Sequence, residues 1–252
     1  YSGAVVHDCF NFLTVVILLP IELITGYLAK TAHLLSNLVY GATGATFQSP
    51  VKAAVKPLTK SLHGFLLNNA NFSKEATGTI GIILGFIFIF ITLFVLVKFM
   101  RRITATQVEG KIQRVFSANG YITIAIGIAI TILVQSSSIT TSILVPMLGA
   151  GILSLEQAFP LTLGANLGTT ITALLASLAG NQAGLTIALA HLIFNISGTA
   201  MFYPWEKTRQ IPLNMARKLA RFTVRNKKFA GIYILLIFFI LPLIGMYIMD
   251  SI

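Results

Sequence analysis

Two long runs of apolar residues most constrain how this chain can fold. They are TIGIILGFIFIFITLFVLV at 79–97 and FAGIYILLIFFILPLIGMYIM at 229–249. Each is close to the roughly 20 residues that cross the hydrocarbon core of a bilayer. The whole chain is 56% hydrophobic and 10% charged, whereas a soluble domain is about 25% charged. We therefore predict an all-α polytopic membrane protein.

The net charge of +11 has a topological explanation that makes a nucleic-acid partner unnecessary. Of the 18 lysines and arginines, five lie at 98–114 and eight at 207–228. Both groups adjoin apolar runs, as the positive-inside rule expects of cytoplasmic loops. We place 101–118 and 205–228 in the cytoplasm and expect no nucleic acid. The single cysteine, Cys9, allows no internal disulfide.

The chain divides into predicted crossings and loops. The predicted segments are a first crossing at 5–28, a polar loop at 29–78 with short amphipathic pieces near 31–40 and 50–68, a second crossing at 79–99, an apolar–polar–apolar unit at 121–153, crossings at 155–179 and 185–203, the basic segment 205–228, and a final crossing at 229–249. Because the chain opens on Tyr1 and not on Met, we treat it as a fragment or a trimmed chain.

The unit 121–153 does not fit the series of full crossings. If it enters and leaves on one side, both basic loops lie in the cytoplasm. Its apolar arms, 121–134 and 139–153, have fourteen and fifteen residues, which is too short to span. Between them lies QSSS, and polar non-helical backbone at this depth must pack in protein or line a wet cavity. We predict a re-entrant hairpin of two half-helices with QSSS at its tip.

Two stretches, 4–20 and 188–204, match each other at a constant offset. The matching pairs are Ala4/Ala188, His7/His191, Phe10/Phe194, Asn11/Asn195 and Pro20/Pro204. Internal repeats of this kind mark secondary transporters. At the same offset, a partner for QSSS would precede the chain. We therefore predict that 79–204 is a complete inverted repeat, that 1–28 is the last helix of a truncated first repeat, and that 229–252 is the final helix.

The QSSS tract, Gln135–Ser138, offers hydroxyls, an amide and the first backbone N–H groups of the following helix. Those N–H groups have no partner within the helix, and with the macrodipole they form an anion site. The oxygens of the tract also suit a hard monovalent cation. The alternative is helix–helix packing, where Ser and Thr are common. The position of four polar residues between two short arms favours a site.

A second polar element, GANLGTTIT, follows within the predicted crossing 155–179. Gly164 and Gly168, with Asn166 between them, predict either a broken helix or very close packing. Thr169 and Thr172 share a helix face. Their hydroxyls, unwound carbonyls and the amide of Asn166 would make a sodium cage. A small-residue packing motif is the alternative, and both stay open.

Asp8 and Asn11 form a third polar element inside an apolar segment. An acid in such a place is a functional-site hypothesis by default, either as a cation ligand or as a partner for a helix end. Asn195 joins it as the repeat counterpart of Asn11. His7 and His191 are more typical of satisfied core histidines.

These motifs resemble the second repeat of the type II sodium-dependent phosphate cotransporters. The resemblance rests on QSSS, then LTLGANLGTTIT, HLIFNISG and a Tyr-Pro pair, while VVHDCFN at the start resembles the end of that family's first repeat. It covers nearly the whole chain, in family order and spacing.

The resemblance implies import of inorganic phosphate driven by the sodium gradient, with Na⁺ as the co-transported ion and no organic cofactor. It implies that Gln135, Ser136, Ser137 and Ser138 form one of two hairpin tips around phosphate. It implies one sodium site at Asp8 and Asn11, with the acid associated with electrogenic transport. A further sodium site would be lined by Gln135, Ser136, Thr169 and Thr172.

The chain departs from the family pattern in three ways. The first QSSS is absent, so its partner would come from an N-terminal repeat outside this chain. Ala165 stands where relatives can carry serine. The chain stops at Ile252, where some relatives add another span. In addition, the loop 25–78 lacks cysteine and is short compared with the disulfide-bearing loop of animal members, which favours a bacterial protein of the inner (plasma) membrane.

Other functions compete with phosphate symport. A sodium-coupled transporter of sulfate or a small carboxylate would use the same site chemistry. A non-transporting membrane subunit would explain the missing half. An intramembrane hydrolase using Ser136 or Ser138 lacks a GxSxG elbow, so we expect no enzyme. The sequence leaves stoichiometry, affinity and oligomeric state open, including a homodimer.

Overall fold

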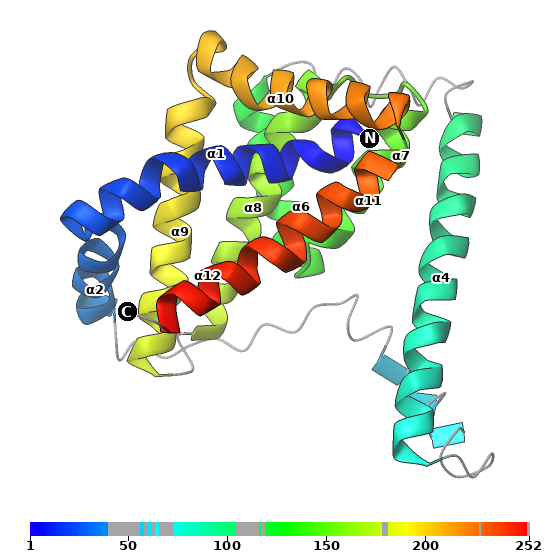
Figure 1. Ribbon diagram of the computed structural model, residues 1–252, viewed down its shortest axis with the longest axis horizontal. Coiled ribbons are helices and arrows are strands. Elements are labelled where there is room, and N and C mark those ends of the chain that lie inside the picture. The colour runs from blue at the N-terminus through cyan, green and yellow to red at the C-terminus, as the bar shows by residue number, and fades with distance from the viewer. Residues whose placement is uncertain are drawn as a thin grey trace.

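The computed structural model describes residues 1–39, 73–103, 119–177, 181–226 and 228–250, with isolated residues at 56–57, 60–61, 64–65 and 116. The helices are α1 (Ser2–Thr25), α2 (Tyr27–Val39), α4 (Lys74–Ile103), α6 (Gly120–Val134), α7 (Ser137–Gly149), α8 (Leu155–Ser177), α9 (Gln182–Phe202), α10 (Glu206–Arg225), α11 (Lys228–Leu235), the π-helix η2 (Leu236–Ile240) and α12 (Leu241–Asp250) (Figure 1). The predicted all-α class is confirmed for this described part.

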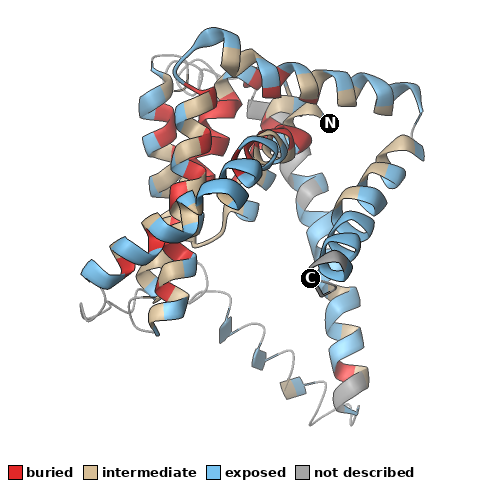
Figure 2. Ribbon diagram, turned by 60° about the vertical axis from the view of Figure 1, so that its left-hand side comes forward, coloured by how far each residue is buried: buried red, intermediate tan, exposed pale blue. Residues whose placement is uncertain are grey.

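Four stretches of these helices are long and apolar enough to cross a membrane. They are α1, α8, α9 and the run 228–247 through α11, η2 and α12. None of the most apolar window of 228–247 is buried inside the molecule, and the residues 241–247 of α12 are all exposed; Figure 2 shows this part of the helix in pale blue. Helix α4 has 30 residues, about 45 Å. Such long apolar surfaces are what lipid covers, and this is a multi-pass membrane protein.

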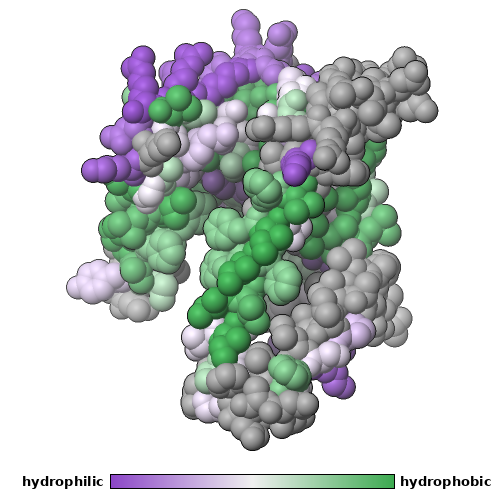
Figure 3. Space-filling model, turned by 90° about the vertical axis from the view of Figure 1, so that its right-hand side faces the viewer, coloured by the Kyte–Doolittle hydropathy of each residue, from purple (hydrophilic) through white to green (hydrophobic). Residues whose placement is uncertain are grey.

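Hydrophilic side chains gather at one end of the molecule. Figure 3 shows them along the upper edge, where Figure 1 places α10, with apolar side chains covering much of the surface below. The sequence identified 205–228 only as a basic segment, but most of it is a helix. Pro212, Leu213 and Ala216 are the buried residues of α10, and their spacing makes the helix amphipathic.

The first predicted crossing ends earlier than expected, at Thr25. Gly26 ends α1 because it adopts the left-handed conformation, with φ 66°. The carboxylate of Glu22 then accepts hydrogen bonds from the N–H groups of Leu28 (2.5 Å) and Ala29 (3.1 Å). These bonds satisfy the first turn of α2. The piece expected near 31–40 is thus α2, while the piece expected at 50–68 lies mostly outside the described residues.

The prediction of a broken helix at 164–172 is wrong, because α8 is one continuous helix. The alternative, very close packing, is correct. A Cβ atom at Gly164 would overlap the Ile124 carbonyl and lie 2.9 Å from the Gly127 Cα; one at Gly168 would lie 2.7 Å from the Thr131 Cβ. The glycines therefore let α6 and α8 approach backbone to backbone.

The core near the start of the chain is organised around Phe10. Its side chain is fully buried, and its ring packs edge-on against Phe159 of α8 (centroids 6.1 Å apart) and Phe202 of α9 (6.0 Å). This contact fixes α1 against α8 and α9. It places the polar residues that surround Phe10 in sequence, Asp8 and Asn11, beside the other polar elements.

Candidate functional site

The helix breaks at the QSSS tract. Gln135 caps the end of α6 in the left-handed conformation, with φ 55° and ψ 34°. It is the one non-glycine residue with positive φ in the described part of the chain. Ser136 then caps α7: its Oγ accepts a hydrogen bond from the Ile139 N–H at 3.3 Å. Consecutive C-cap and N-cap residues turn the chain between two short helices.

Two buried threonines hold the helices together beside this turn. The Oγ1 atoms of Thr131 in α6 and Thr140 in α7 lie 2.9 Å apart. Thr140 Oγ1 is also 3.2 Å from the Ser136 carbonyl oxygen, to which it can donate. Since a buried hydroxyl without a partner is costly, this pair stabilises the arrangement of the turn.

A cavity of 440 Å³ lies between α1 and α7 and brings predicted site residues together. It is lined by Gly3, Ala4, His7 and Asp8 from α1, Ser137, Ser138, Thr141, Ser142 and Val145 from α7, and Phe238 from η2. The predicted anion residues Ser137 and Ser138 therefore share a cavity with the predicted cation ligand Asp8. Gln135 and Ser136 are not among its lining residues.

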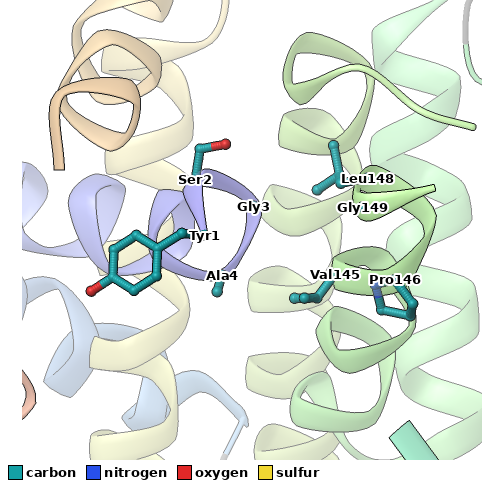
Figure 4. A pocket seen from close by; sticks show the side chains of 8 residues that line it. All are labelled: Tyr1, Ser2, Gly3, Ala4, Val145, Pro146, Leu148 and Gly149. Atoms are coloured by element: carbon teal, nitrogen blue, oxygen red, sulfur yellow. The ribbon is translucent and has the colours of Figure 1, made fainter. Parts of the chain in front are cut away.

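The cavity adjoins a second one of 280 Å³, between the start of α1 and the last turns of α7 (Figure 4). Gly3, Ala4 and Val145 line both cavities. Figure 4 shows Gly3 and Ala4 of α1 across the gap from Val145 and Leu148 of α7, and a Cβ atom at Gly3 would overlap the Leu148 side chain. Small residues thus let α1 approach α7 closely beside the cavity.

His7, Asn11 and Asn166 form a polar cluster that joins α1 to α8. The His7 Nε2 lies 2.5 Å from Asn166 Oδ1 and 3.3 Å from Asn11 Nδ2. The Asn166 Nδ2 donates to Asn11 Oδ1 at 3.1 Å. Asn166 is buried, so its amide needs these partners. Two predicted sodium ligands, Asn11 and Asn166, are therefore in direct contact, and His7 contacts both.

The Asp8 carboxylate has two polar neighbours, His7 and Tyr233. His7 Nδ1 lies 3.5 Å from Oδ1, and the Tyr233 hydroxyl donates to Oδ2 at 3.4 Å. The Asp8 side chain is 25% exposed. Tyr233 belongs to α11, so the last crossing contributes to the surroundings of the acid.

The remaining predicted sodium ligands lie outside the cavity lining. Thr169 Oγ1 donates to the Ala165 carbonyl (3.1 Å) and Thr172 Oγ1 to the Thr169 carbonyl (2.7 Å). Their protons are used within α8, and their lone pairs are left to accept or to bind a cation. Asn195 is buried in α9. Among the described residues, no group of three His, Cys, Asp or Glu side chains could hold a metal ion.

The two histidines differ from the expectation that both are core residues. His7 is half-buried and joins the polar cluster, whereas His191 is exposed on α9. Cys9 is buried, as predicted. Sequence reasoning missed Tyr233 and Phe238 as neighbours of Asp8 and the cavity. The available signal was a tyrosine hydroxyl within an apolar crossing, which needs a polar partner.

Comparison with known proteins connects this chain to a family. The family described as Na+/Pi-cotransporter matches residues 88–251. Sodium-dependent phosphate transport protein 2A is 33% identical in Rattus norvegicus and 34% in Ovis aries, and protein 2B of Homo sapiens is 29% identical. Each match covers 96% of this chain and 48–49% of the relative. The chain thus spans about half the length of these curated relatives. No solved structure matches it.

Proposed function

This chain belongs to the Na⁺/Pi-cotransporter family, a family of transporters and not of enzymes. From that premise we propose that the chain forms half of the path by which sodium and inorganic phosphate enter the cell together. The observation that carries the proposal is the 440 Å³ cavity shared by Ser137, Ser138 and Asp8. The proposed anion-binding and cation-binding groups meet there, so a bound anion and a bound Na⁺ would interact directly.

In this proposal Gln135, Ser136, Ser137 and Ser138 hold phosphate. Ser137 and Ser138 begin α7, so their N–H groups belong to the first turn, which has no partners within the helix. The helix dipole adds positive potential at the same place. Both hydroxyls can donate to a phosphate oxygen. Ser136 accepts from Ile139, which leaves its hydroxyl proton for the ligand.

Sodium binds in this proposal to oxygen atoms of two neighbouring sets. Asp8 with Asn11 and Asn166 supplies a carboxylate and two amide oxygens around His7. The second set consists of Gln135, Ser136, Thr169 and Thr172. Asn195, the repeat counterpart of Asn11, is a further proposed sodium ligand. Bound Na⁺ lowers the repulsion between the Asp8 carboxylate and phosphate in one cavity, which couples the two ligands.

The proposed path works by alternating access between two repeats. We infer that α6 and α7 form a re-entrant hairpin, that 79–204 is an inverted repeat, and that an N-terminal repeat with the other QSSS completes the phosphate site. Membrane lipid surrounds the assembly in a plasma membrane, with 101–118 and 205–228 cytoplasmic. The short loop 29–78 supports a bacterial origin, and a homodimer is compatible with this arrangement.

The test is uptake of labelled phosphate into proteoliposomes, using the full coding sequence that contains this chain. An inward Na⁺ gradient should drive uptake and choline should not. Asp8→Asn should raise the Na⁺ concentration for half-maximal uptake, and Ser138→Ala should raise the phosphate KM, each by about ten-fold for one charge-assisted contact. Ser177→Ala is the control, because its hydroxyl bonds the Leu174 carbonyl outside the cavity.

The outcomes separate the competing functions. Uptake that ignores sodium would overturn the coupling. Sodium-driven uptake of sulfate or a carboxylate, without phosphate, would overturn the substrate. No uptake of any of these solutes by a folded protein would favour a structural subunit.

A further inference from the structure

Helix α10 connects two candidate membrane spans and therefore lies at a membrane surface. It follows α9, which ends at Phe202, and precedes the span that begins at Lys228. Figure 1 shows it lying across one end of the helices, and Figure 3 shows hydrophilic side chains along that end. A helix in this position contacts the lipid headgroup region.

Two of the basic residues of α10 are used within the protein. The Arg209 Nε donates to the Tyr203 carbonyl at 2.9 Å, and its guanidinium lies 4.6 Å from the centre of the Tyr203 ring. Arg217 forms an ion pair with Glu156 of α8. These contacts, with the buried residues Pro212 and Leu213, hold one face of α10 against the bundle.

The other basic residues of α10 share the opposite face. They are Lys207, Lys218, Arg221 and Arg225, all exposed. Their spacing of 11, 3 and 4 residues keeps them on one side of an α-helix. Within the described part of the chain, the ion pairs involve other residues. Four positive charges therefore face outward without an acidic partner there.

A groove runs between the basic face and the buried face. Its volume is 380 Å³, and it is lined by Ile211, Asn214, Met215, Lys218, Leu219 and Phe222. Met215 and Leu219 pack against the core, whereas Ile211 and Phe222 are exposed. The groove thus offers an apolar surface with one positive charge and one amide.

We propose that this groove and the adjacent basic face of α10 bind an anionic phospholipid of the cytoplasmic leaflet. The apolar side chains of the groove contact the glycerol and upper acyl region, and Lys218, Arg221 and Arg225 attract the headgroup. The positive face complements the negative surface of that leaflet. A zwitterionic lipid satisfies the apolar part alone. The inference does not depend on phosphate transport.

The experiment places a fluorescent reporter in the groove. The chain has one tryptophan, Trp205, at the N-cap of α10. Trp205→Phe with Phe222→Trp moves the fluorophore to the groove. In nanodiscs of zwitterionic lipid, a small fraction of brominated anionic or brominated zwitterionic phospholipid is added, and quenching is compared at equal mole fraction.

The proposal predicts excess quenching by the anionic lipid. Each Lys or Arg at an anionic surface contributes about five-fold in affinity. Lys218→Gln/Arg221→Gln/Arg225→Gln in the reporter chain should therefore lower the affinity about one hundred-fold and abolish the excess, whereas Lys218→Arg should keep it. The unchanged chain, with its reporter at Trp205, serves as the control for quenching outside the groove.

Two measurements keep the proposal testable without the triple variant. On the reporter chain, 1 M salt should remove most of the excess, because screening becomes strong at that concentration. Inorganic phosphate should leave it unchanged, because the ligand is a lipid. Equal quenching by both lipids, or an excess that survives charge removal or salt, would overturn the proposal. Displacement by phosphate would assign the basic face to a soluble anion instead.

Discussion

Gln135 is the residue at which the backbone and the proposed chemistry make opposite demands. Its φ of 55° suits glycine, and a side chain there costs about 1 kcal/mol. Glycine would also end α6 in this conformation. A glutamine in this conformation leads to the hypothesis that its amide binds a ligand, since strain persists where a site uses it.

A pair of substitutions separates these two demands. Gln135→Gly removes both the amide and the strain, whereas Gln135→Ala removes the amide alone. We expect the glycine variant to exceed the alanine variant by about 1 kcal/mol in the free energy of unfolding, with Na⁺-driven phosphate uptake lost in both. Thermal unfolding in detergent and proteoliposome uptake measure the two effects. Full uptake by Gln135→Gly would show that the amide takes no part.

Some of the polar residues that the sequence singled out line one cavity, whereas their apolar neighbours were not predicted. Asp8, Ser137 and Ser138 were recognisable because polar groups in apolar helices are expensive and rarely accidental. The structure adds Tyr233 and Phe238 near them. These belong to a crossing far along the chain, and neither periodicity nor composition indicates which apolar helix faces which acid.

At the level of single helices, composition predicted the break at QSSS but not the continuity of α8. Both regions contain small and polar residues, so local propensity treats them alike. The difference is tertiary. Gly164 and Gly168 are matched by α6, and the threonine hydroxyls of α8 bond carbonyls of their own helix. The glycines serve packing, which only the neighbouring helix reveals.

Gly164 should therefore tolerate no side chain. In Gly164→Ala the new methyl group meets the Gly127 Cα at 2.9 Å and the Ile124 carbonyl, and these backbone atoms cannot move aside. We expect the free energy of unfolding to fall by roughly 1–3 kcal/mol, as it does in overpacked cores. Thermal unfolding in detergent measures this loss.

The matched control is Gly85→Ala in α4, where a Cβ atom meets nothing within 4 Å. This exposed helical position should gain up to about 1 kcal/mol from the higher helix propensity of alanine. Equal stability of the two variants would mean that α6 and α8 are not in close contact.

At the scale of the whole molecule, the order of the apolar helices in the described part of the chain follows the order of the apolar runs in the sequence. The positions of the crossings agree with the helices within a few residues at most boundaries, for example 155–179 against Leu155–Ser177. What the sequence did not reveal is α10, because a basic amphipathic helix has no long apolar run. Its apolar side chains are spaced along one face, and only packing against the bundle distinguishes it from a loop.

The orientation of the helices in the membrane can be tested by labelling introduced cysteines, because the chain has a single native cysteine. Cys9 is buried, so a cysteine placed at an exposed site should be the main target of a membrane-impermeant maleimide. Asn119, Asn181 and Lys218 are exposed. Asn181 and Lys218 are separated by α9, a span of 21 residues, so they should face opposite sides.

The decisive comparison is between Asn119→Cys and Lys218→Cys in right-side-out and inside-out vesicles. If α6 and α7 enter and leave on one side, both cysteines react only from the cytoplasm, and Asn181→Cys reacts only from outside. Five basic residues at 98–114 and eight at 207–228 favour this arrangement. Labelling of Asn119→Cys from outside, with Lys218→Cys inside, would mean that α6 and α7 together cross the membrane. The proposed re-entrant hairpin and the inverted repeat would then both be wrong.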